Sequence, residues 1–163
     1  MNHTVNTVLD RYWDRQLPID PKKIAEAWGA RVEEITDSES DYDNDGLSGI
    51  AVIKKGVPRI YYSPSDHPNR QRFTIAHELA HHVLGHTKEG EKHRDSVADY
   101  STGAKSHLEI EANKFAAALL MPEVAIRTLI TREGVSTTLE LARIFKVSEA
   151  AMHWRLKEIG LAY

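Results

Sequence analysis

The stretch Phe73–His86, FTIAHELAHHVLGH, decides how this 163-residue chain is interpreted. It places four of the chain's nine histidines within ten residues, at His77, His81, His82 and His86. His77 and His81 are four residues apart, so on a helix both imidazoles leave the same face about one turn apart and can reach one cation. Glu78 lies beside them, and the three residues form the pattern HExxH.

This pattern predicts a hydrolytic zinc site. Two neutral imidazoles bind Zn²⁺, and the intervening Glu78, too far round the helix to join them easily, lies against the water on the metal. We expect Glu78 to act as general base and then to carry a proton to the leaving amine. Zinc lowers the pKa of bound water from about 15.7 toward roughly 7 and polarises the substrate carbonyl.

Such chemistry needs a third protein ligand and one open position. The chain has no cysteine, so the ligand must be His, Asp or Glu. A second helix, predicted over residues 108–120, offers Glu109 and Glu111, which point about 200° apart, so only one can face the site. Glu109 shares a face with Asn113, which we expect to reach the outer nitrogen of a ligating histidine. We therefore prefer Glu109 to Glu111 as the third ligand of one zinc ion.

Two other interpretations of the histidine pair remain. His77 and His81 could be ordinary histidines on a half-buried helix, since a bare HExxH also occurs by chance. The zinc could also be purely structural, but closed sites favour four protein ligands, usually with cysteine. The apolar setting of the helix and the second acidic helix favour the catalytic interpretation.

The donor that stabilises the oxyanion of the reaction is not identified by residue type. Such a donor is usually needed besides zinc, and the candidates by type are Tyr61, Tyr62, His82, His86, His107 and Arg127. His82 and His86 do not share the ligand face with His77 and His81. We expect them to be exposed or capping histidines near the helix end, where the helix dipole favours a protonated imidazole.

The rest of the chain predicts an α+β fold, in which a small mixed sheet with a β-hairpin packs on the HExxH helix. Apolar spacing predicts an N-terminal helix around residues 5–13. A further N-terminal helix is expected to start at Asp20 and Pro21 and to end at Gly29. The other predicted elements are a strand at 30–35, the hairpin 47–53 and 58–63, the HExxH helix at 69–85, a polar loop at 87–106, and helical segments at 125–130, 137–145 and 148–160.

Composition describes an ordinary globular protein, with a net charge of −3 that implies neither nucleic acid nor an anionic membrane as partner. The N-terminal residues have no apolar run, which predicts a cytoplasmic protein without a signal or membrane span. The acidic segment 38–46 begins like a calcium loop, with Asp41, Asp43 and Asp45. Its twelfth position would be Val52 where a bidentate Glu is needed, so we favour a solvated loop.

The motifs RFTIAHELAHHVLGH (72–86) and ExEANxFAAALLMP (109–122) resemble those of the ImmA/IrrE family of bacterial metallopeptidases. The segments IDPKKIAEAWGARVEEI, PRIYYS and LARIFKVSEAAMHWRLKEIGL also fit, so the resemblance covers most of the chain. It implies a zincin-like core in which His77, His81 and Glu109 are the ligands and Glu78 is the catalytic glutamate. Asn113 takes the place of the residue that supports a ligand histidine in gluzincin-type peptidases.

The resemblance also implies a substrate. The family's members cleave helix-turn-helix repressors, usually encoded beside them, and so derepress genes. By the same resemblance, the strand with Ile60, Tyr61 and Tyr62 is expected to be the edge strand along which an extended substrate lies. The function expected is therefore a zinc-dependent endopeptidase that cleaves a co-encoded repressor.

The C-terminal segment leaves a second function open. Residues 141–161 look like a helix-turn-helix, so we divide the chain into a metallopeptidase domain at 1–122 and an HTH-like helical subdomain at 123–163. Basic and acidic residues alternate there, which is weak for phosphate binding, and we favour a packing subdomain or a docking surface for the repressor. The alternative is a non-proteolytic DNA-binding regulator, or a toxin–antitoxin partner, with a structural or vestigial metal site.

Overall fold

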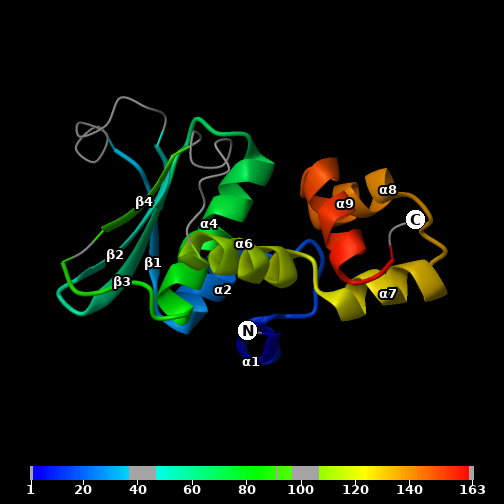
Figure 1. Ribbon diagram of the computed structural model, residues 1–163, viewed down its shortest axis with the longest axis horizontal. Helices are drawn as coiled ribbons and strands as arrows, with labels where there is room; N and C mark the ends of the chain where they lie inside the picture. Colours follow the sequence, from blue (N-terminus) through cyan, green and yellow to red (C-terminus); the bar gives the residue numbers. More distant parts are fainter. Residues whose placement is uncertain (1, 37–46, 91, 97–106, 162–163) are drawn as a thin grey trace.

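The computed structural model describes residues 2–36, 47–90, 92–96 and 107–161. Figure 1 shows a sheet at one end of the molecule, the helices that carry the histidines beside it, and the C-terminal helices at the other end. The predicted calcium-like or solvated loop at 38–46 lies outside the described residues. Within the described residues, no helix is both long enough and apolar enough to cross a membrane.

The helices follow the sequence patterns closely. Asp20 caps the second helix by accepting a hydrogen bond from Lys23 N, and Gly29 ends it with a φ of 119°, a left-handed conformation that glycine adopts without strain. The two N-terminal helices, the HExxH helix, the acidic helix and the C-terminal helices are confirmed. Their bounds are α1 Asn2–Tyr12, α2 Pro21–Trp28, α4 Pro68–Val83, α6 His107–Leu120, α7 Glu123–Arg132, α8 Thr138–Phe145 and α9 Glu149–Glu158.

The sheet is mixed and has the strand order β1-β3-β2-β4. Strand β3 pairs parallel with β1 and antiparallel with β2, and β2 also pairs antiparallel with β4. The predicted first strand and hairpin are therefore confirmed. The strands are β1 Arg31–Glu34, β2 Leu47–Lys54, β3 Val57–Tyr62 and β4 Lys92–Ser96.

Strand β4 corrects the sequence prediction of a loop over residues 87–106. Lys92–Ser96 pairs with β2 from Val52 to Leu47, with a register shift between Leu47 and Gly49. The segment KHRDS has no apolar alternation, and an edge strand needs only backbone pairing on one side to form. The segment therefore has no hydrophobic periodicity from which a strand could be predicted.

Strand β3 is not an edge strand, so the expectation of an edge strand there is wrong, whereas the substrate-binding role of Ile60, Tyr61 and Tyr62 stays a prediction. Ile60 pairs with Val32 on one side and with Ala51 on the other, and its side chain is fully buried. With both sides of β3 hydrogen-bonded, no backbone groups are left there for an extended peptide. Among the described residues, the edges of the sheet are β1 and β4.

Helix α4 lies between the sheet and α6, and this position places the histidines (Figure 1). Ala76 and Ala80 on α4 and Ala112 and Ala116 on α6 are fully buried. Small side chains allow the helix backbones to approach closely. Phe115 fills the remaining space in the same core, and the two helices can therefore share one polar site.

The C-terminal helices are joined to α4 through Arg72. Its guanidinium donates hydrogen bonds to the backbone oxygens of Ile19, Phe145 and Lys146, the last two at the end of α8. Partial burial lowers the pKa of Arg72. Buried side chains on both sides of residue 122, including Phe115 and Met152, belong to one core, and the division into two domains stays a prediction.

Candidate metal centre

Three side chains from two helices converge beside the sheet. His77 and His81 on α4 are fully buried, and Glu109 enters from the first turn of α6. Glu109 Oε2 lies 3.0 Å from His77 Nε2, and Glu109 Oε1 lies 3.1 Å from His81 Nε2. The two Nε2 atoms are 3.2 Å apart. These are the same three residues that the sequence predicts as metal ligands.

The arrangement fits a divalent metal. Ligand atoms of a tetrahedral zinc site with bonds of about 2.0–2.1 Å lie roughly 3.3 Å apart, close to the three separations observed. Two imidazoles and one carboxylate also match the donors of catalytic zinc sites, which keep a position for water or substrate. Among the described residues, this is the one group of three or more such side chains whose ligand atoms lie within 4.8 Å of one another.

Glu78 is fully buried and lies against the backbone of β2. A Cβ atom at Gly49 would collide with Glu78 Oε1 and would approach Thr74 Cγ2 to 2.6 Å. Position 49 must therefore stay glycine for the carboxylate to occupy its place. A glycine inside a predicted strand is a known sign of close backbone approach, and this sign was available in the sequence LSGIAVI but was not used.

The outer nitrogen of His81 meets a histidine. His81 Nδ1 lies 3.0 Å from His86 Nδ1, and His86 Nε2 lies 3.0 Å from Glu111 Oε2. Glu111 Oε1 is also 2.9 Å from His107 Nε2. If His81 Nε2 binds a cation, Nδ1 carries the proton and donates it to His86 Nδ1, and His86 Nε2–H then donates to Glu111. This series holds the His81 ring in the orientation that a ligand needs.

This role of His86 and Glu111 differs from the expectation. His86 was expected at the helix end, exposed or capping, and Glu111 only as the less favoured alternative to Glu109. His86 instead follows the end of α4, where its N–H bonds to His81 O at 2.8 Å and turns the ring back toward His81. The sequence does show a histidine five residues after the predicted ligand His81. However, helix geometry predicts side-chain positions only within a helix, and His86 lies beyond the end of α4.

Asn113 lies on the face of α6 that follows Glu109, with a half-buried side chain. Its Oδ1 atom is buried and has no hydrogen-bond partner within the described residues. The structure thus does not bring this oxygen to His77 or His81, and the supporting role expected for Asn113 stays a prediction.

His82 points away from the other three histidines. His82 Nδ1 lies 2.9 Å from Thr87 Oγ1, and its Nε2 lies 2.9 Å from the carbonyl oxygen of Arg59 on β3. Both ring nitrogens are therefore used to attach α4 to the sheet and to the segment after it. His82 is buried, contrary to the expectation of an exposed or capping residue.

The two tyrosines named for substrate binding lie on opposite faces of the sheet. Tyr61 packs with Ile50 and Val52, away from α4, and accepts a hydrogen bond from Lys54 Nζ. Tyr62 packs against the core that contains α4 and pairs with Gly49, which is next to Glu78. Of the two, Tyr62 is on the face of the metal centre.

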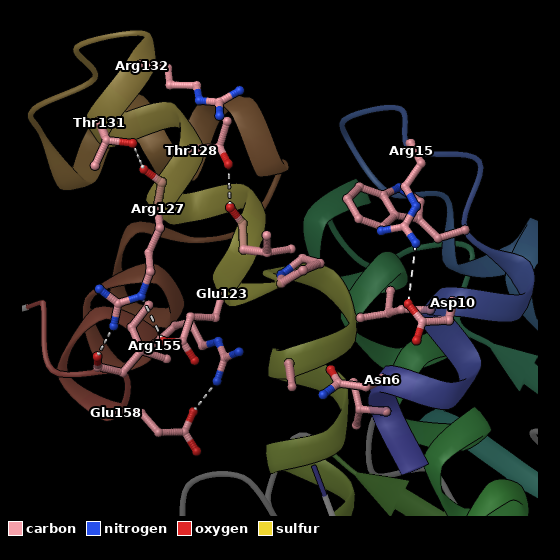
Figure 2. A pocket seen from close by; sticks show the side chains of 17 residues that line it. Asn6, Asp10, Arg15, Glu123, Arg127, Thr128, Thr131, Arg132, Arg155 and Glu158 are labelled. Atoms are coloured by element: carbon pink, nitrogen blue, oxygen red, sulfur yellow. Dashed lines mark hydrogen bonds and ion pairs between the residues drawn. The ribbon is translucent and has the colours of Figure 1, made fainter. Parts of the chain in front are cut away.

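Arg127, the remaining candidate oxyanion donor, lines a separate groove of about 830 Å³ between α1, α7 and α9 (Figure 2). There it donates to Glu123 at 2.8 Å and to the carbonyl oxygen of Ile159 at 3.0 Å. Arg15 and Arg155 in the same groove pair with Asp10 and Glu158. None of the metal-centre residues lines this groove, so its size does not mark it as the place of the chemistry.

The site belongs to the class of HExxH metalloproteins with a hydrolase-type site. One helix carries two histidines and a glutamate, a second helix supplies a carboxylate, and the sheet lies against the glutamate. The comparisons with known proteins agree with this class. The family model of peptidase M78, described as the IrrE N-terminal-like domain, matches residues 25–157. The chain belongs to this family.

A curated relative is the radiation response metalloprotease IrrE of Deinococcus deserti (strain DSM 17065 / CIP 109153 / LMG 22923 / VCD115). The two sequences are 34% identical over an alignment of 127 residues, and the alignment covers 69% of this chain and 44% of the relative. The chain thus spans less than half the length of that relative. The family model and this relative together confirm the resemblance to the ImmA/IrrE family.

Proposed function

We propose that the chain is a zinc-dependent endopeptidase that acts in the cytoplasm on a helix-turn-helix repressor and so derepresses genes. The observation that carries the proposal is the convergence of His77, His81 and Glu109 within 3.2 Å of one another, beside the buried carboxylate of Glu78. Family membership and the metalloprotease relative support a peptidase.

Zinc is proposed on the chemistry of the donors. Imidazole nitrogens and one carboxylate suit Zn²⁺, whereas Mg²⁺ and Ca²⁺ prefer oxygen ligands throughout. His77, His81 and Glu109 would hold the ion. A bound zinc ion supplies a Lewis acid for the substrate carbonyl and lowers the pKa of water at the site.

The chain's own residues supply the proton transfers. Glu78 takes a proton from the attacking water as its oxygen bonds to the carbonyl carbon. The same carboxyl then gives the proton to the amine nitrogen as the carbon–nitrogen bond breaks. Gly49 keeps the carboxylate in place from one side, and Tyr62, on the same face of the sheet, is the proposed donor to the oxyanion.

Strand β4 replaces β3 as the proposed place for an extended substrate. It is the edge of the sheet on the side of β2, and Asp95 pairs with Gly49, the residue next to Glu78. An edge strand has unpaired backbone groups that can bind a peptide by strand addition. The substrate backbone would then run past the metal centre.

The repressor as substrate rests on the resemblance to the ImmA/IrrE family. The D. deserti relative is named for a radiation response, which is compatible with regulated proteolysis in this family. The DNA-binding alternative has less support, because α9 carries as many acidic as basic residues. One of its basic side chains, Arg155, is buried and donates to Met121 O at 2.9 Å.

The proposal is tested with purified protein and the product of a neighbouring repressor gene. Metal analysis should give close to one zinc per chain, and the zinc-loaded protein should cut the repressor, as detected by intact-mass spectrometry. The metal-free protein should not cut it. If the zinc-loaded protein leaves every neighbouring repressor intact but shifts DNA in a salt-dependent way, the regulator alternative is correct.

A further inference from the structure

The groove of about 830 Å³ between α1, α7 and α9 has the size and the walls of a ligand site. Ligand pockets commonly have volumes of roughly 300–1,000 Å³, apolar walls and a few polar groups. The apolar side chains of Val5 and Leu9 line this groove on the side of α1, and Pro122 and Ile159 line it from the C-terminal part. The groove can therefore hold a small organic molecule.

The cations of the groove are all arginines, and no lysine or histidine lines it. A guanidinium presents a planar fork of N–H donors that matches the two oxygens of a carboxylate, whereas the ammonium group of lysine is a point charge. In Figure 2, three of the arginines lie on the side of α7 and α9, and Arg15 lies opposite them on the side of α1. These cations therefore favour a ligand with an oxyanion group. The three on the side of α7 and α9 are Arg127, Arg132 and Arg155.

The carboxylates of the groove do not neutralise its arginines completely. Four arginines against three carboxylates give the groove a formal charge of +1, although the whole chain has a net charge of −3. Arg132 is the arginine without a hydrogen bond or ion pair within the described residues. One bound carboxylate would therefore neutralise the groove. The three existing pairs are Asp10–Arg15, Glu123–Arg127 and Glu158–Arg155.

Arg155 offers a donor to the groove from a nearly buried side chain, which is 9% exposed. Its Nε donates to Met121 O at 2.9 Å, and its Nη1 donates to Glu158 Oε2 at 2.8 Å. These two contacts fix the orientation of the guanidinium. Within the described residues, Nη2 has no hydrogen-bond partner, and it is not enclosed by protein atoms. The N–H groups of Nη2 are therefore available to a ligand in the groove.

The guanidinium of Arg127 lies at the same end of α9. Its Nε donates to Glu123 Oε1 at 2.8 Å, and its Nη2 donates to Ile159 O at 3.0 Å. Ile159 follows Glu158, the partner of Arg155, so the two arginines are held beside consecutive residues. In the part of the chain that the structure describes, Nη1 of Arg127 has no partner. Contacts within the protein thus use Nε and one Nη of each arginine and leave the other Nη for an anion.

We propose that this groove binds an organic anion in which a carboxylate is attached to an apolar group. Arg127 and Arg155 donate charge-assisted hydrogen bonds to the carboxylate oxygens. The apolar group lies against Val5 and Leu9, where burial removes it from water. The site does not depend on the proposed peptidase function, because the groove and the metal centre share no residue. A free carboxylic acid and the C-terminal residue of a protein both offer this chemistry.

The test uses the zinc-loaded full chain and two probes, N-acetylphenylalanine and its amide, which differ only in the carboxylate. An NMR titration follows the backbone amides of the groove residues Ala118 and Thr128, which separates binding in the groove from binding of a carboxylate to zinc. The acid should bind at least about 10-fold more tightly than the amide, the gain expected from hydrogen bonds to a charged group.

A third probe, acetyl-Gly-Gly-Gly-Phe with a free C-terminus, distinguishes the two sources of the carboxylate. Tighter binding of this peptide than of N-acetylphenylalanine would support a protein C-terminus as the ligand. Equal binding of the two would support a free carboxylic acid, because the added residues then make no contact.

Arg155→Met and Arg127→Gln should each remove most of the preference for the acid. Arg127 is half-exposed, so Arg127→Gln covers the case in which Arg155→Met does not fold. Arg143→Gln is the matched control, because it removes an exposed arginine of α8 outside the groove and should keep the preference. Equal binding of acid and amide, binding of neither, or a preference unchanged in both groove variants would overturn the site. The arginines would then serve only to join helix ends.

Discussion

The metal centre and the α4–α8 junction are both held by polar contacts with α4, but they differ in the kind of atoms involved. At the metal centre, the side chains of His77, His81 and Glu109 meet. At the junction, Arg72 meets backbone oxygens, at Phe145 and Lys146. Any residue type offers a backbone oxygen. A site built from side chains can therefore be predicted from a sequence, whereas a contact with backbone atoms cannot.

Loss of a metal ligand should give the largest effect. Glu109→Ala removes one of three proposed ligands, and the zinc affinity should fall by more than about 100-fold, beyond the 10- to 100-fold typical for residues that only support a ligand. The measurement is competition with a chromophoric chelator at fixed pH. Zinc affinity within twofold of the wild type would show that Glu109 is not a ligand.

The residues that orient His81 should have an intermediate effect. His86→Ala and Glu111→Gln should each lower zinc affinity by about 10- to 100-fold. In His86→Ala, the proton on His81 Nδ1 loses its acceptor. In Glu111→Gln, His86 loses its carboxylate partner. The double variant should be little worse than either single variant, since the residues act in series. Additive losses would mean that they act separately. Lys114→Gln, on the exposed face of α6, is the control.

A substitution at the α4–α8 junction should lower the stability of the protein and leave its metal affinity nearly unchanged. Arg72→Met keeps the apolar part of the side chain and leaves three backbone oxygens without their donor, which should lower the free energy of unfolding by about 1–3 kcal/mol. Urea denaturation measures this change, with exposed Arg143→Met as the control. Zinc affinity should stay within a few-fold of the wild type. A loss of affinity as large as that of Glu111→Gln would show that the two regions are coupled.

The smallest expected effect is at the start of α8. The pKa of Glu140 is lowered, mainly by its side-chain hydrogen bond with Thr137 in the capping box. A lowered pKa in the folded state means that Glu140 stabilises the protein above the unfolded pKa of about 4.3 and loses this effect as the pH falls through the folded value. The difference in unfolding free energy between wild type and Glu140→Gln should be present at pH 7 and should shrink as the pH falls below the unfolded pKa of Glu140 and through its lowered folded pKa.

Sequence patterns were sufficient to predict the helices and strands that have periodic apolar residues or capping residues. The apolar stripe of α4, the capping residue Asp20 and the β-branched hairpin at β2 and β3 all predicted elements that the structure contains. Spacing within each helix also selected the candidate ligands, His77 and His81 on α4 and Glu109 on α6. In each case the signal is local, because it lies within one helix or one hairpin.

The remaining features depend on contacts between distant segments. Strand β4 forms because β2 offers its backbone, and β3 becomes central because β1 pairs with it from an earlier part of the chain. His86 reaches His81 only after α4 has ended. Periodicity within a segment contains no information on these pairings, and so the order of the strands and the support of His81 could not be predicted from it.

In the proposed reaction, Glu78 performs proton transfer at a metal held by other residues. The most direct measurement compares zinc-loaded wild type and Glu78→Gln in cleavage of the repressor, with zinc content determined on the same samples. This role of Glu78 predicts an equal zinc content in both proteins and a loss of cleavage in Glu78→Gln of at least about 100-fold, the lower range for general acid–base catalysis. Cleavage by Glu78→Gln at the wild-type rate, with zinc bound, would contradict it.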